Sequence, residues 1–512
     1  MTYEPVIGLE VHAELLTKSK MFCGCAVVDS TEAPPNTVVC PVCAGMPGTL
    51  PVINERAVEF ALRVALALNC SIPEINVFAR KNYFYPDLPK GFQISQYELP
   101  LAVNGWLDIE TSNGSPSATL RRSSTKRVRI RRVHLEEDTG KLFHHDPHDG
   151  GPGEPALPEH SVVDLNRSGV PLLEIVTEPD LRSAEEVKAY AAALRTLLRY
   201  LGVNSGDMEK GVIRFEPNIS VRPVGSAELR TRTELKNLNS FRAIERGVGY
   251  EVERQTQVWE SGGTVTQETR GWSEAEGVTL PQRRKEFADD YRYFPEPDLP
   301  PLVIDQARVE RIRAELPELP AAKRARFESE YGLSRYDADL LVEDRAVADY
   351  FERAVGHQKS EMRNPKSIAN WMTGELFRLM NESGHSLGEA RTRVTPEDLA
   401  ELAALVTAGT INLPTAKTVF EEMYRTGRAP LTIVAEKGLG QVSDAGEIEK
   451  LVDEVLAANP DQLATYLGGK ATIEQWLFGQ VMRRTQGRGN PQVIRRALGE
   501  KLEALKQKRT QG

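Results

Sequence analysis

The feature that most constrains this chain is an abrupt change of sequence pattern near residue 300. Before it, short runs such as Val6–Ala13 and Val128–Val133 alternate between polar and apolar residues, and glycine and proline interrupt them often. Residues 289–301 contain four prolines, and from residue 307 onward the apolar residues follow a helical spacing. The sequence therefore predicts an α+β fold, with a mainly antiparallel sheet first and helices after it.

The chain is long enough for about three domains, because each domain takes about 150 of its 512 residues. A polar break at 383–392 precedes Thr395, a typical helix-starting residue, and marks a second boundary. Earlier in the chain, Asn54 and Ser183 are each placed to cap a helix. We expect three domains: a sheet domain at 1–298, an all-α linker domain at 299–394 and an all-α tail domain at 395–512.

Four of the five cysteines form two short pairs, Cys23 with Cys25 and Cys40 with Cys43. Two such pairs separated by a loop are typical of a structural zinc site with four thiolate ligands. Two disulfides or four free thiols are the alternatives, and the lack of a visible secretion signal favours zinc. No apolar run reaches the ~20 residues of a membrane span, so we expect a cytoplasmic protein without membrane contact.

The first predicted strand brings acidic side chains and an imidazole together. Glu10, His12 and Glu14 share one face of it, because side chains alternate along a strand. Taken alone, they fit a solvated edge better than a site for a hard cation. Glu174 is harder to explain, since it interrupts the apolar run Val170–Val176. A buried carboxylate is costly unless it is paired or bound to a metal.

The adjacent acids Glu136 and Glu137 follow a strongly basic strand, where simple charge balancing is one explanation. A magnesium site is the other explanation, because Mg²⁺ takes one or two carboxylates and keeps room for water and phosphate oxygens. Period-two spacing places Glu136 on the face of His134 and Glu137 on the opposite face, which leaves the choice of ligand open. The candidate magnesium site comprises Glu10, His12, Glu136, Glu137 and Glu174.

Residues 80–96 combine Lys81 and Lys90 with aromatic residues in a segment that proline interrupts. Lysine acts as a point charge on phosphate and an aromatic ring can cover a purine, so this segment is a candidate ATP contact. A basic surface loop with packed aromatic rings is the alternative. The chain contains neither the phosphate-binding P-loop motif nor the Rossmann glycine fingerprint, so ATP would bind through side chains and a metal.

The charge is distributed unevenly along the chain. The total of 64 basic and 73 acidic residues gives −9, which argues weakly against a general nucleic-acid binder. Residues 475–512, however, carry nine basic residues and two acidic ones, a balance of 9 − 2 = +7. A solvated helix face or a surface for a phosphate backbone explains this equally well. The candidate contacts are Arg483, Arg484, Arg488, Arg495 and Arg496.

Long strings of the sequence resemble one known family, the B subunit of the bacterial tRNA-dependent amidotransferase. The strings are Ile7–His12, Cys40–Pro51, Arg80–Gly91, His134–Asp138, Glu234–Phe241 and Asp290–Asp298. They occur in the family's order and cover essentially the whole chain. A stretch rich in glycine, proline and histidine between His144 and His160 looks like a loop extension.

The resemblance implies a cradle-shaped catalytic domain, a helical linker and a helical tail that contacts tRNA. It implies that ATP phosphorylates the side-chain carboxylate of Glu-tRNA(Gln) or Asp-tRNA(Asn), and that ammonia then displaces the phosphate. An amidase (A) subunit would make the ammonia from glutamine, and a small C subunit would complete a heterotrimer. A non-catalytic, zinc-containing scaffold that binds tRNA is the competing hypothesis.

The resemblance also implies roles for the candidate residues. The family's magnesium ligands lie in the strings that hold Glu10, His12, Glu174 and the pair Glu136/Glu137, and Glu137 and Glu174 are favoured. Lys81 and Lys90 are assigned to phosphate or channel roles, and the tail that holds the five candidate arginines is assigned to tRNA contact. The four-cysteine zinc site occurs in part of the family, where its role is structural.

Overall fold

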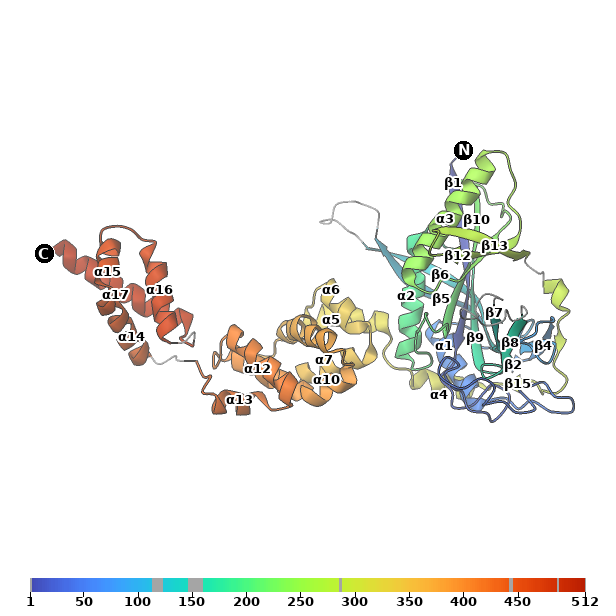
Figure 1. The fold of residues 1–512 in the computed structure, drawn as a ribbon, viewed down its shortest axis with the longest axis horizontal. Coiled ribbons are helices and arrows are strands. Elements are labelled where there is room, and N and C mark those ends of the chain that lie inside the picture. The colour runs from blue at the N-terminus through green and yellow to red at the C-terminus, as the bar shows by residue number, and fades with distance from the viewer. Residues whose placement is uncertain are drawn as a thin grey trace, which may run out of the picture. The chain divides into compact units, whose positions relative to one another are not determined.

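The computed structural model describes residues 2–112, 123–145, 160–284, 288–441, 445–485 and 488–511 (Figure 1). The chain divides into two compact units, Met1–Pro320 and Ala321–Gly512. The interior of the predicted loop extension, 146–159, lies outside the described residues. The division into three domains stays a prediction.

An eight-stranded sheet organises the first unit. Its strands in spatial order are β13 (Val278–Arg284), β12 (Glu268–Ser273), β11 (Thr233–Lys236), β10 (Ile213–Pro223), β1 (Tyr3–Glu14), β9 (Pro171–Thr177), β6 (Ser123–Glu137) and β5 (Ala102–Ser112). All neighbouring strands pair antiparallel except β11 and β12. The predicted α+β class with a mainly antiparallel sheet is confirmed.

The sheet has one apolar and one polar face, and β1 shows why. Leu9, Val11 and Ala13 are buried in the core, whereas Glu10 and His12 on the opposite face are half-buried. Three helices share the core with the apolar face, namely α1 (Glu55–Ala67), α2 (Ala184–Tyr200) and α3 (Phe241–Glu260). In Figure 1, α2 and α3 run beside the sheet. Within the described residues, these three helices contribute to the core on the apolar side, and the polar side chains of β1 lie on the other face.

Both predicted helix caps are present. The side chain of Asn54 accepts hydrogen bonds from the amides of Arg56 and Ala57, and that of Ser183 accepts from the amide of Glu186. These bonds satisfy amide groups that have no partner inside the helix. After the proline-rich segment, α4 (Gln306–Ala314) packs on α1 and joins the same core, so the first unit continues to residue 320.

Short elements complete the first unit. They are β14 (Phe294–Pro295) with β3 (Ala79–Asn82) and β4 (Phe92–Ser95), β15 (Leu302–Val303) with β2 (Ile75–Asn76), β7 (Lys141–His145) with β8 (His160–Asp164), and the 3₁₀ turn Ala288–Tyr291. Of the two predicted phosphate contacts, Lys81 lies on β3 and Lys90 in the loop between β3 and β4. Strand β14, in the proline-rich segment, pairs with β3.

The described part of the second unit is helical, as predicted. Its helices are α5 (Pro320–Tyr331), α6 (Arg335–Val342), α7 (Arg345–His357), α8 (Pro365–Asn370), α9 (Phe377–Ser383), α10 (Leu387–Arg393), α11 (Pro396–Thr407), α12 (Leu413–Thr426), α13 (Pro430–Glu436), α14 (Ala445–Ala458), α15 (Pro460–Leu467), α16 (Ile473–Arg484) and α17 (Pro491–Gln511). Helices α14, α16 and α17 share an apolar core. Across the described ranges, every helix is too short or too polar to cross a bilayer.

Candidate active site on the polar face of the sheet

A row of side chains crosses the centre of the polar face. Strand pairing sets His12 of β1 opposite Glu174 of β9, and Glu174 opposite His134 of β6. The distances from Glu174 Oε2 are 3.6 Å to Nε2 of His12 and 3.1 Å to Nε2 of His134. The carboxylate that interrupts the apolar run is therefore paired with two imidazoles.

Glu136 completes a three-ligand group with His12 and Glu174. Its Oε1 lies 3.8 Å from Nε2 of His12, and one ligand atom from each residue lies within 4.8 Å of the others. Ser95 on β4 donates a hydrogen bond of 3.0 Å to the other oxygen of Glu136, which fixes the orientation of the carboxylate. Two carboxylates and one imidazole can hold a divalent cation.

A second group lies beside the first and consists of carboxylates alone. Glu10 of β1, Glu216 of β10 and Glu234 of β11 bring oxygens within 4.8 Å of one another. Neighbouring side chains donate hydrogen bonds to these carboxylates: Asn218 to Glu10 at 3.0 Å, Lys236 to Glu216 at 2.8 Å and Thr269 to Glu234 at 2.7 Å. This donor set suits a cation that prefers oxygen ligands, such as Mg²⁺.

The charges of the first group depend on one another. Burial disfavours the charged form of His12, but the nearby carboxylates of Glu174, Glu216 and Glu136 raise its pKa to about 9. Burial also disfavours the charged form of His134, but the carboxylates of Glu174 and Glu136 raise its pKa. Burial opposes ionisation of Glu174, yet the two imidazoles lower its pKa well below the usual range. The carboxylates of this row thus favour the charged forms of both imidazoles, and the imidazoles favour the charged form of Glu174.

Both ligand groups line a cavity of about 430 Å³. Lys81 also lines it, with Nζ 4.9 Å from the ring centroid of Tyr291 and 5.5 Å from that of Tyr83. Burial opposes the charge of this ammonium, but nearby Glu136 raises its pKa. A permanently charged lysine beside carboxylates and aromatic rings fits a polyphosphate contact.

Glu137 and Lys90 lie elsewhere and face each other. Lys90 donates a hydrogen bond to Oε1 of Glu137, and the amide of Ile94 donates to the same oxygen at 3.0 Å. Gln93 binds the main-chain carbonyl of Glu137 at 2.7 Å. The structure therefore brings Glu136, and not Glu137, into the ligand group with His12.

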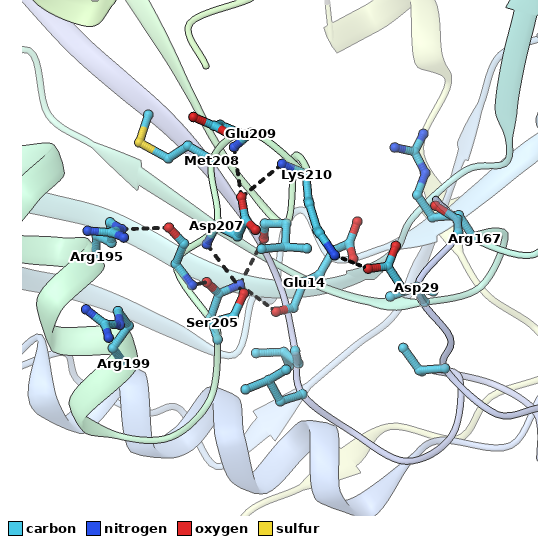
Figure 2. A pocket seen from close by; sticks show the side chains of 18 of the residues that line it. Glu14, Asp29, Arg167, Arg195, Arg199, Ser205, Asp207, Met208, Glu209 and Lys210 are labelled. Atoms are coloured by element: carbon cyan, nitrogen blue, oxygen red, sulfur yellow. Dashed lines mark hydrogen bonds and ion pairs between the residues drawn. The ribbon is translucent and has the colours of Figure 1, made fainter. Parts of the chain in front are cut away.

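A larger cavity of about 910 Å³ adjoins this region (Figure 2). Figure 2 shows Lys210 reaching Asp29, at a distance of 2.5 Å, while Arg195 and Arg199 extend from α2. Arg167 lines both cavities, and its Nε lies 3.8 Å from Asp138 in the smaller one. The larger cavity contains neither ligand group, so we place the chemistry in the smaller one.

The four clustered cysteines lie together, with Sγ of Cys43 3.8 Å from that of Cys40 and 4.0 Å from that of Cys25. These cysteines are free, which excludes the disulfide alternative. A tetrahedral zinc with Zn–S bonds of about 2.3 Å needs sulfurs about 3.8 Å apart. A hydrogen bond from Cys23, the amide of Cys40 and nearby Lys20 lower the pKa of Cys43 to about 4. The cluster fits zinc.

The five tail arginines differ in exposure. Arg483 and Arg484 at the end of α16, and Arg495 and Arg496 on α17, are exposed. Arg488 is half-buried and donates a hydrogen bond to the carbonyl of Gly438. Four of the five candidates are therefore accessible to a phosphate backbone, and Arg488 also has a structural contact.

Two ligand residues, Glu216 and Glu234, were not identified from the sequence. The alternation of Arg214, Glu216 and Asn218 along β10 was a local signal for a polar face. Glu234 lies inside a string that carried the family resemblance, but no local pattern marks it as a ligand. Only strand pairing brings both to Glu10.

The fold and the site define a class: an enzyme candidate with two cation-ligand groups on an antiparallel sheet and a separate helical unit. Residues 5–310 match the family model for the GatB/GatE catalytic domain, and residues 349–502 match the model for the GatB domain. The chain belongs to the GatB family, the B subunits of tRNA amidotransferases.

Curated relatives match over nearly their whole length. The B subunit of the aspartyl/glutamyl-tRNA(Asn/Gln) amidotransferase of Roseiflexus sp. (strain RS-1) is 50% identical, over 98% of this chain and 99% of its own. The protein of the same name from Herpetosiphon aurantiacus is 51% identical, over 98% of this chain and all of its own. That from Caldanaerobacter subterraneus subsp. tengcongensis is 49% identical over the same shares. These matches give the scaffold alternative no support.

Proposed function

We propose that this chain catalyses the ATP-dependent amidation of Glu-tRNA(Gln), Asp-tRNA(Asn) or both. The observation that carries the proposal is the pair of ligand groups, built around His12 and Glu10, that line one cavity. The names of the relatives support this substrate class. A scaffold without chemistry has no use for two clusters of carboxylates of which four, Glu136, Glu174, Glu216 and Glu234, are buried, because a buried carboxylate is costly.

The reaction takes two steps. An oxygen of the aminoacyl side-chain carboxylate attacks the γ-phosphorus of ATP, the bond to the β-phosphate oxygen breaks, and ADP leaves. The nitrogen of ammonia then attacks the acyl carbon, the bond to the phosphate oxygen breaks, and phosphate and a proton leave. The first step is needed because a carboxylate oxygen is a poor leaving group and phosphate is a good one.

The residues of both ligand groups fit magnesium. We assign the ligands His12, Glu136 and Glu174 to one ion, and Glu10, Glu216 and Glu234 to a second. Bound Mg²⁺ supplies positive charge to the transferring phosphoryl group. Glu136 replaces Glu137 as the expected ligand, because the carboxylate of Glu137 is taken by Lys90 and the amide of Ile94.

Other residues hold the reactants. Lys81 is oriented by the tyrosine rings and places its charge against the phosphates of ATP. Lys90, held by Glu137, keeps its proposed role beside a phosphate or the ammonia path. The exposed tail arginines contact the tRNA backbone. An amidase (A) subunit supplies ammonia, and a small C subunit completes the heterotrimer. Zinc occupies the site of the four cysteines and has a structural role. The assembly works in the cytoplasm.

The test uses the chain co-expressed with its two partner subunits. We expect ATP-dependent conversion of at least one of the two misacylated tRNAs to its amide. The Glu174→Ala and His12→Ala complexes should still bind tRNA and hydrolyse glutamine, because those activities lie elsewhere. They should lose activation of the aminoacyl carboxylate, and unchanged activation in both would refute the proposed site.

A further inference from the structure

The side chain of Lys20 is fully buried, which is rare for a lysine without a partner. Its Nζ donates to the carbonyls of Val38 at 2.9 Å and Leu165 at 3.3 Å, and to Sγ of Cys43 at 3.5 Å. Among the residues that the structure describes, no carboxylate forms an ion pair with this ammonium. A buried charge without a counter-charge is strongly destabilising, so Lys20 needs an anion.

A zinc tetrathiolate is an anion of the required kind. Four thiolates and one Zn²⁺ carry a net charge of about −2, because −4 and +2 are added. Cys43 is the most buried of the four ligands, at 3% exposure, and its sulfur is the one that Lys20 touches. The ammonium of Lys20 therefore offsets half of the net charge of the zinc tetrathiolate. It does so beside the most buried sulfur, where water screens the charge least.

Lys20 also joins two segments that are distant in sequence. Val38 lies between the two cysteine pairs, whereas Leu165 lies in the segment 164–170 between β8 and β9. Further hydrogen bonds join the same two segments. The amide of Val38 donates to the side chain of Asn166 at 2.9 Å, and the hydroxyl of Ser168 donates to the carbonyl of Cys43 at 3.0 Å. A shift of the cysteines would therefore move the segment 164–170.

The segment 164–170 carries Arg167 to the edge of the candidate active site. Its guanidinium donates to the carbonyls of Thr139 at 3.1 Å and Gly140 at 2.7 Å. Its Nε lies 3.8 Å from Asp138, which lines the same cavity as the two ligand groups. The position of Arg167 thus depends on the backbone that Lys20 ties to the cysteines.

We propose that Lys20 is a positioning residue: it offsets half of the net charge of the zinc tetrathiolate and clamps the segment 164–170 to it, so that zinc holds Arg167 in place. The inference rests on zinc at the four cysteines. It does not require the amidation reaction, so the two proposals can fail separately.

The first experiment measures zinc affinity in the full chain, by competition with a chelating dye at neutral pH. The variant Lys20→Met keeps the length of the side chain and removes its charge, and Lys18→Met, at an exposed lysine nearby, is the control. Loss of a partner beyond the ligands typically weakens metal binding by about 10–100-fold, which we expect for Lys20→Met alone. Equal affinity in the three proteins, or a wild-type chain that binds no zinc, would overturn the proposal.

The second experiment uses the wild-type chain and so does not depend on the folding of a variant. Hydrogen exchange of the amides of 164–170 is compared with zinc bound and after chelation. Exchange in this segment should accelerate at least about tenfold without zinc, while the amides of α3 stay unchanged. Equal exchange in both states would show that the cysteine cluster does not hold the segment.

Discussion

Glu174→Gln is the substitution that tests the central row of the site most directly. The change keeps the size of the side chain and removes the charge between His12 and His134. Raising the pKa of His12 from 6.5 to about 9 corresponds to about 3 kcal/mol. This is a net effect: burial opposes the charge of His12, and three carboxylates outweigh burial, at 3.6 Å (Glu174), 3.8 Å (Glu136) and 3.9 Å (Glu216) from the ring. Glu174 is the nearest of the three.

We therefore assign about half of the effect, about 1.5 kcal/mol, to Glu174. The pKa of His12 in the metal-free variant should fall by about one unit. Because the pKa is raised in the folded state, its stabilisation is present below pH 6.5 and is lost as the pH rises through about 9. The free energy of unfolding of the variant should consequently depend less on pH in that interval.

The assay is an NMR titration of ¹³C-labelled histidine in the metal-free full chain, which has eight histidines. A His12→Gln protein identifies the signal of His12. Glu234→Gln is the matched control, since Glu234 belongs to the neighbouring ligand group and not to the His12 group. This assignment to Glu174 is refuted if the pKa of His12 is the same in the Glu174→Gln protein as in the Glu234→Gln control. Glu174 would then not be the carboxylate that favours the charged form of His12.

Three further predictions address the helix caps, the buried acids and the tail. Asn54→Ala removes the cap of α1 and should lower the free energy of unfolding of the first unit by about 1 kcal/mol in urea; no change would refute the cap. Burial and the charge of Asp138 raise the pKa of Glu14 from 4.5 to about 8. Because the unfolded chain loses this proton at lower pH than the folded one, Glu14 destabilises the folded state as the pH rises from 4.5 through 8. Glu14→Gln should melt higher than wild type at pH 9 and equally at pH 5, and equal melting at both would contradict this. The double substitution Arg495→Ala/Arg496→Ala should weaken tRNA binding and reduce the salt slope by about 1.5, whereas an unchanged slope would exclude phosphate contacts there.

Point substitutions are the right test of the tail, because deletion of its last helices would damage its fold. Val452 of α14 packs in one core with Val481 of α16 and Leu498 of α17. A chain that ends before α16 would expose this core, so lower affinity would then have two explanations. The arginines named above are exposed and can be changed without opening the core.

Local sequence patterns predicted those features of the fold that depend on residues close together in the sequence. The alternation of Leu9, Glu10 and Val11 follows from strand geometry and predicted both faces of β1. The caps at Asn54 and Ser183 follow from side chains that bind amides two or three residues on. The place of α4 in the sheet core has no local signal, because α4 is a helix by local pattern and joins that core through its packing on α1.

The ligand groups depend on strand register, which the sequence of one strand does not contain. Period-two spacing put Glu136 on the face of His134, but only the pairing of β6 with β9 brings that face to Glu174. A bulge between Ile130 and Arg132 shifts the register of β6 along β9, and no residue pattern indicated it. The residues alone therefore left the choice between Glu136 and Glu137 open, and the preference for Glu137 came from the family resemblance.

Strand β1 connects the two ligand groups, because Glu10 belongs to one and His12 to the other. Two residues along a strand span about 6.7 Å, so the backbone of β1 sets the spacing of the groups. This strand is paired on both sides, to β9 and β10, and packs on the core below, which leaves it little freedom to move. Ligands fixed in this way need no reorganisation when charge develops on a phosphoryl group. Arg167, by contrast, comes from a connecting segment and needs a separate support, which the cysteine cluster and Lys20 are placed to give.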